Sequence, residues 1–284
     1  MKKTLITATA VATVMSASAA YADLSLGGAL ARQINSGDGT SGISNTSTSS
    51  TINVDYTTTL NNGMGMSANA DITPSGTVYL LTVSSDMGSF FTGSDFASAV
   101  DSYDGAQGAG RYSGGGRILT SATAFNDGDT ASGNGFGIST SVAGASVSAT
   151  MGAGANRALS IAGSMNIAGA TVKAGNTDFD TSGSPDHGFM TVGYSVGGFN
   201  LGWNHFDMGD DSYTQMGAST SVGGLGVGIS AGDLEDANDN DHDAMGIHVS
   251  GDLGGAFWVV DYISEDDGAG TETDNWYLTV GTGF

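Results

Sequence analysis

The chain is a succession of segments of about ten residues in which apolar residues alternate with small or polar ones. The last segment places Trp276, Leu278 and Val280 on one parity, and Asn275 and Thr279 on the other. A period of two is the signature of a β-strand with one apolar and one polar face. The same alternation recurs in 52–60, 64–72, 159–167, 190–196, 199–204, 225–230 and 245–250.

The connectors between these segments alternate between short and long. The short ones are rich in Gly and Asn, which tolerate positive φ in hairpin turns, and lie at 61–63, 86–88, 143–144, 168–169, 197–198, 223–224 and 254–255. The longer ones lie near 34–50, 73–76, 94–134, 153–156, 178–186, 208–211, 233–241 and 264–273. Hairpins at the short connectors, with a first strand at 24–33 and a last at 274–284, predict about 16 strands. All short turns then lie at one end of the sheet.

The N-terminus has the features of an export signal. Lys2 and Lys3 precede an uncharged stretch, 4–14, and Ala20-Tyr21-Ala22 forms a small-residue cleavage site. The apolar stretch is too short to span a bilayer. We therefore expect residues 1–22 to be a signal peptide and residues 23–284 to form one domain in the periplasm, the outer membrane or the exterior.

Composition excludes several classes of protein. The absence of cysteine excludes a disulfide framework, Cys-ligated zinc and iron–sulfur clusters. Only 7 Lys and Arg in a chain of formal charge −22 exclude nucleic-acid binding by phosphate neutralisation. The 47 glycines have no three-residue period, which excludes collagen. No apolar run is long enough for a transmembrane helix.

A soluble β-sandwich and a transmembrane barrel remain as folds for such strands. A sandwich needs a tightly packed core between its sheets, whereas the polar faces here are mostly Gly, Ser, Thr and Asn and the apolar faces lack charge over most of their length. A transmembrane barrel has lipid outside and water inside, so we expect no packed core, and its closure pairs every backbone group. The sequence therefore predicts an all-β, transmembrane antiparallel barrel with short periplasmic turns and long external loops.

Several segments resemble one family of such barrels. The last strand, ending in Phe284, is similar to the assembly signal of Gram-negative outer-membrane barrels. The segments 24–31 (LSLGGALA), 77–80 (TVYL), 86–95 and 133–153 resemble parts of alphaproteobacterial general-diffusion porins. The resemblance implies an outer-membrane homotrimer, assembled through Phe284 by the barrel-assembly machinery, with its third loop folded into the lumen.

The third connector, 94–134, is the longest, and connectors of this length are usually functional or disordered. A loop folded into a wide barrel narrows the pore, and its charges then act in a confined space. Its candidate constriction residues are Asp95, Asp101 and Asp104 in the first half and Arg111 and Arg117 in the second.

Charges on the strands complete the predicted lining. Asp55 and Asp71 have lumen parity, and Lys173 is the one basic residue that clearly shares it. Arg32 falls on the apolar parity near a strand end, which fits either a bulge or a rim position. General porins oppose an acidic loop with basic wall residues, and this chain departs from that pattern. We predict a net negative pore that favours cations.

Other candidate sites are weaker. The run 233–243 offers calcium ligands, with Asp236, Asp239 and Asp241 as candidates, but Asp241 occupies the place of the usual turn glycine. A calcium site and a solvated acidic loop with loosely bound divalent ions both stay open. The four histidines are dispersed, which disfavours zinc, and no catalytic motif occurs, so we expect neither an enzyme nor a required cofactor. Outward Trp and Tyr residues fit an interfacial girdle or ordinary strand aromatics.

The leading hypothesis is a passive channel for ions and small hydrophilic solutes. Two alternatives are a secreted or surface-anchored Gly-rich β adhesin and a structural barrel without an open pore. An adhesin would show a fixed repeat period and tolerate loss of Phe284, whereas a plugged barrel would give no steps of conductance.

Overall fold

The structure, a computed structural model, describes residues 23–37, 44–74, 76–94, 99, 135–152, 158–179, 185–237, 241–266, 268 and 270–283, with side chains except at 30–50 and 283. The predicted signal peptide and Phe284 lie outside these residues. In the described part of the chain, no helix combines the length and the apolar character needed to cross a membrane.

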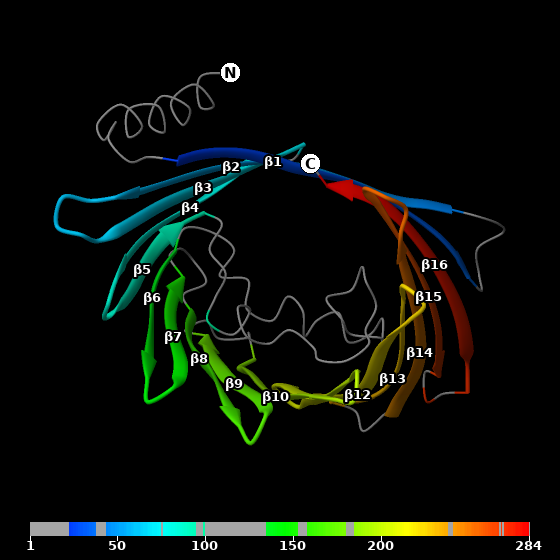
Figure 1. Cartoon of the computed structure of the whole chain (residues 1–284). Helices are drawn as coiled ribbons and strands as arrows, with labels where there is room; N and C mark the ends of the chain where they lie inside the picture. The colour runs from blue at the N-terminus through cyan, green and yellow to red at the C-terminus, as the bar shows by residue number, and fades with distance from the viewer. Residues whose placement is uncertain are drawn as a thin grey trace.

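Sixteen antiparallel strands close into one barrel in which every strand pairs with its neighbours in sequence and β1 pairs with β16 (Figure 1). The strands are β1 (Asp23–Gly37), β2 (Ser44–Thr59), β3 (Gly65–Thr73), β4 (Gly76–Ser85), β5 (Gly88–Gly93), β6 (Gly135–Val142), β7 (Ala145–Gly152), β8 (Ala158–Ile167), β9 (Ala170–Phe179), β10 (His187–Val196), β11 (Phe199–Met208), β12 (Asp211–Val222), β13 (Leu225–Glu235), β14 (Asp241–Asp252), β15 (Ala256–Asp266) and β16 (Glu272–Gly283). Closure leaves no unpaired edge.

All seven predicted short connectors are tight turns at one end of the barrel, which we call the short-turn end. Ala143 and Gly144, for example, have φ of 52° and 85°, as expected for a two-residue hairpin loop in which both residues are left-handed. The opposite end is called the loop end. Two of its predicted longer connectors, 73–76 and 208–211, are in fact tight turns, because β3, β4, β11 and β12 extend into them.

The outer surface is apolar, as the alternation predicts. On β8 the outward residues Leu159, Ile161, Met165 and Ile167 are all exposed, and Trp276, Leu278 and Val280 repeat the pattern on β16. Tyr56 shares the outward parity but is only 3% exposed and lies in register between Leu24 of β1 and Ala68 of β3.

The expectation that the barrel needs no packed core is wrong. A buried apolar cluster, here called the inner cluster, occupies the inner face of the wall at the loop end. Its inward parity is clear from β11, where Phe206 is fully buried while Phe199 and Leu201 are exposed. The members are Ala99, Ala162, Phe189, Phe206, Tyr213, Leu234, Ala244, Ile263 and Tyr277, with Met208 packed against them.

Candidate functional site

The inner wall has two sectors of different character, and the first is a polar ladder on β2 and β3. Asn69 Nδ2 donates a hydrogen bond to Asp55 Oδ1 at 2.5 Å, and Asn53 Nδ2 donates one to Asp71 Oδ1 at 2.6 Å. These residues face each other in register across the two strands, on the face opposite the exposed Ile52. All four side chains are half-buried, so this sector combines polar groups with access to solvent.

Both carboxylates of the ladder accept a hydrogen bond from an amide side chain. A neutral amide donor satisfies one oxygen of each carboxylate without cancelling its charge. Among the described residues, the ion pairs that the geometry shows involve histidines and not Asp55 or Asp71. Within the described part of the chain, the ladder therefore presents two carboxylates on the inner wall without a basic side chain paired to them.

The second sector, here called the covered sector, is the inner face of β7 to β15 at the loop end, where side chains are excluded from solvent. Its polar members include Thr150, Ser160, Thr177, Asn204 and Gln215, each at most 2% exposed. At the short-turn end of the same strands the inward side chains are exposed, including Asn166, Ser195 and Asn200. Solvent access to the inner wall is thus wide at the short-turn end and uneven at the loop end.

The third connector reaches this covered sector at Ala99. Ala99 is fully buried in the inner cluster, and its backbone N–H donates a hydrogen bond of 2.7 Å to Thr150 Oγ1 on β7. Thr150 pairs with Gly137 of β6 and Ser160 of β8. Ala99 therefore lies inside the barrel, as the porin resemblance implies for this loop.

The structure describes only some of the remaining residues that the sequence predicts for the site. Lys173 lies on the inward parity of β9, in register between Ser164 and Thr191, and is half-buried. Arg32 pairs with Val280, and the register between β1 and β2 shifts one residue later, between Gln33 and Ile34, so both the bulge and the rim position stay open for Arg32. The candidates Asp95, Asp101, Asp104, Arg111 and Arg117 lie outside the described residues, and so does the side chain of Arg32.

A histidine and a buried carboxylate meet on the inner face of β14 and β15. His248 Nδ1 lies 2.7 Å from Oδ1 of Asp261, which is only 2% exposed. The second carboxylate oxygen, Oδ2 of Asp261, is buried without a hydrogen-bond partner. Because a buried carboxylate is costly without partners, the contact with His248 offsets part of the cost of burying Asp261.

Acidic side chains gather on the outer face at the loop end. Asp233 pairs in register with Asp243, Asp243 with Asp266, and Asp266 with Glu272, so four carboxylates form a row across β13 to β16. Neighbouring like charges in register repel one another. This carboxylate row was hidden in the sequence, because 233–243 was expected to be loop, whereas β13 and β14 extend through most of it.

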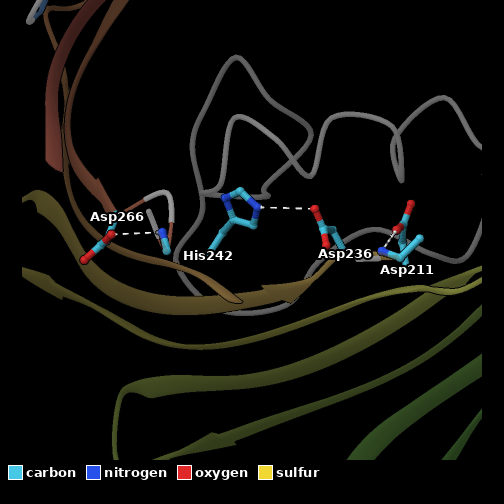
Figure 2. A network of polar contacts seen from close by, with 6 residues as sticks. Asp211, Asp236, His242 and Asp266 are labelled. Carbon is cyan, nitrogen blue, oxygen red and sulfur yellow. Dashed lines mark hydrogen bonds and ion pairs between the residues drawn. The ribbon is translucent and has the colours of Figure 1, made fainter. Parts of the chain in front are cut away.

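Of the three calcium candidates, the structure describes two. Asp236 lies 3.9 Å from His242 Nε2, and Asp241 belongs to β14, while Asp239 lies outside the described part (Figure 2). Two further acids cap backbone groups: Asp211 accepts the N–H of Ala237, and Asp266 accepts that of Gly268. Within the described ranges no group of three or more candidate ligands could hold a metal ion.

Comparison with known proteins supports the architecture. No protein-family model matches the chain, and no curated protein does. A loop-deletion mutant of OmpT, an outer membrane protein of Vibrio cholerae, superimposes with a TM-score of 0.70 at 14% identity over 93% of this chain and 100% of that one. A porin refined at 1.8 Å resolution gives 0.71 at 16% identity, covering 92% and 100%. A mutant of the Rh. blastica porin gives 0.65 at 17% identity, covering 92% and 100%. This chain therefore has the 16-stranded antiparallel barrel fold seen in solved structures of porins.

Proposed function

We propose that this protein is an outer-membrane channel through which ions and small hydrophilic solutes diffuse passively, with a preference for cations. The observation that carries the proposal is the opposite character of the two faces of one closed wall. The outer face exposes Ile161 and Met165, while the inner face of β2 and β3 presents Asp55 and Asp71. Such a wall suits hydrocarbon outside and water inside.

The outer face supports insertion into a bilayer. Large apolar side chains exposed on strand after strand would be an aggregation hazard in water, whereas a closed barrel in lipid needs them and satisfies its backbone internally. Export by residues 1–22, assembly through Phe284 with the barrel-assembly machinery and association as a homotrimer belong to the same proposal, and the fold of the porin structures supports them by analogy.

The cation preference follows from the polar ladder. Fixed carboxylates in a narrow aqueous passage raise the local concentration of cations and lower that of anions. Lys173 is the described inward base, and it lies on β9, away from β2 and β3 in the closed order of strands. The carboxylates of the ladder and the small number of basic residues therefore both favour cations over anions.

The test is a planar-bilayer recording of purified protein under a KCl gradient. The proposal predicts discrete steps of conductance and a reversal potential with the sign of cation preference, below a limit of about 59 mV for a tenfold gradient. Conductance steps together with a reversal potential of the sign for anion preference would refute the cation preference, but they would still support the channel function.

A barrel without an open pore is the second candidate, because the covered sector excludes solvent from much of the inner wall at the loop end. Absence of conductance steps from protein that is folded in the bilayer would favour it. Deletion of Phe284 distinguishes the adhesin hypothesis from the two barrel hypotheses. The deletion should impair membrane assembly of a barrel, whereas a secreted adhesin should be unaffected.

A further inference from the structure

Amide and carboxylate side chains alternate within the polar ladder. Asn53 and Asp55 share the inward face of β2 and are two residues apart. Asn69 and Asp71 repeat this order on β3. Because the two strands are antiparallel, each aspartate pairs in register with an asparagine of the other strand. The two carboxylates therefore lie on a diagonal of the ladder, and neither lies directly opposite the other.

The hydrogen bonds of the ladder tie the two carboxylates to different partners. Asp55 on β2 accepts its hydrogen bond from Asn69 on β3, at 2.5 Å. Asp71 on β3 accepts its hydrogen bond from Asn53 on β2, at 2.6 Å. Each carboxylate thus has one oxygen held by its own amide across the strand pair. The amides keep the carboxylates from turning toward one another.

The strands on either side of the ladder place no further carboxylate opposite it. The residues of β1 and β4 that pair in register with the ladder are uncharged, and they are Ser25, Gly27, Val78 and Leu80. Asp23 of β1 pairs with Thr57, so it too lies diagonal to Asp55 and not opposite it. The separation of carboxylates at this part of the wall therefore depends on the two asparagines.

This separation matters most for divalent cations. Directly opposite side chains have Cβ atoms about 5 Å apart, whereas diagonal neighbours are about 7–8 Å apart. Calcium binds carboxylate oxygens at about 2.4 Å, so two opposite carboxylates can hold one ion between them. Drawing a second carboxylate from about 7 Å to about 4 Å from the ion strengthens binding about fivefold for a divalent ion in water, and only about twofold for a monovalent one. An ion that is bound too tightly leaves a pore slowly and blocks it.

We propose that Asn53 and Asn69 determine ion specificity, in that they hold the carboxylates of Asp55 and Asp71 apart and so let divalent cations pass together with monovalent ones. The proposal rests on the proposed channel function, for which it names a class of solute, small divalent cations. The asparagines are positioning residues, since they act through the carboxylates and need not touch the ion.

Exchanging Asn and Asp within the ladder tests the proposal without changing composition or net charge. The double variant Asn53→Asp/Asp55→Asn moves one carboxylate directly opposite Asp71. The double variant Asn69→Asp/Asp71→Asn moves one directly opposite Asp55. All four substitutions together restore the alternation, because each aspartate again pairs with an asparagine. The quadruple variant is therefore the matched control for both double variants.

The measurement is the K⁺ current through single channels of the reconstituted protein as CaCl₂ is added at constant ionic strength. In each double variant, the Ca²⁺ concentration that halves the current should be about fivefold lower than in the wild type, and in the quadruple variant it should stay within about twofold of the wild type. Equal values in all four proteins would overturn the proposal. A quadruple variant as sensitive to Ca²⁺ as the double variants would also overturn it. If one double variant does not assemble, the other carries the test.

Failure of the channel function gives a different result. A wild type without conductance steps would overturn the proposed function and with it the passage of ions. Calorimetric titration of the folded proteins with Ca²⁺ in detergent still decides whether the asparagines separate the carboxylates. Tighter binding by both double variants than by the wild type and the quadruple variant would support that separation, and equal binding by all four would overturn it.

Discussion

Neutralising the polar ladder should weaken cation preference without disturbing the wall. Asp55→Asn and Asp71→Asn replace each carboxylate with an amide of the same shape, whose oxygen can still accept the hydrogen bond from Asn69 or Asn53. The double variant therefore removes two charges and keeps the contacts between β2 and β3.

The size of the effect can be worked out from the two charges. A cation about 7 Å from one carboxylate in water gains about 0.6 kcal/mol, and screening at about 0.1 M salt roughly halves this gain. Two carboxylates then contribute about 0.6 kcal/mol together, which is a factor of about three in local cation concentration. Anions are depleted by a similar factor, so the permeability ratio should fall at least about threefold.

The assay is the reversal potential under a KCl gradient, compared at low and high ionic strength because screening weakens the effect as salt rises. Asp178→Asn is the matched control, since Asp178 is exposed on the outward parity of β9 and pairs with the outward Leu159. The reasoning fails if the double variant keeps the wild-type permeability ratio at low salt, or if Asp178→Asn lowers it equally.

Three further predictions concern stability, measured by urea unfolding from lipid vesicles. Phe206→Ala should destabilise the barrel by about 3–5 kcal/mol, because it empties the centre of the inner cluster; a loss below about 1 kcal/mol would show that the cluster is not packed. Asp243→Asn should stabilise it, by at most about 1 kcal/mol, since Asp243 has a carboxylate in register on each side, and the gain should vanish at high salt. His248→Ala should cost about 1–3 kcal/mol by leaving the buried carboxylate of Asp261 without its partner, and an unchanged unfolding midpoint would contradict that role.

The alternation of residues was sufficient to predict most of the architecture. Each predicted strand, such as 159–167, forms one strand of the closed barrel. Parity alone was enough to assign Met165 to the outer face and its neighbour Ser164 to the inner face. The turns followed because few residues other than Gly and Asn adopt positive φ. Strand ends were less predictable: 73–76 and 233–243 contain polar residues that are as compatible with a strand end as with a loop.

The inner cluster could not be predicted from periodicity. Alternation indicates which face of the wall a residue lies on, but not whether that face contacts water or other side chains. A signal was nevertheless present. Near the loop end, inward positions change from Gly, Ser and Thr to Phe189, Phe206 and Tyr213, which is unusual for a water-filled lumen. The contact of Ala99 with Thr150 is also beyond sequence reasoning, since it joins residues 51 positions apart with no shared pattern.

The central claim, lipid outside and water inside one wall, is tested most directly by cysteine labelling, because the chain has no cysteine of its own. Ser164→Cys and Met165→Cys are neighbours on β8 with opposite parity. In protein reconstituted into vesicles, a membrane-impermeant maleimide added to both sides should label Ser164→Cys and spare Met165→Cys, and a lipid-soluble maleimide should label Met165→Cys. Equal labelling of both positions by the water-soluble reagent would contradict the account.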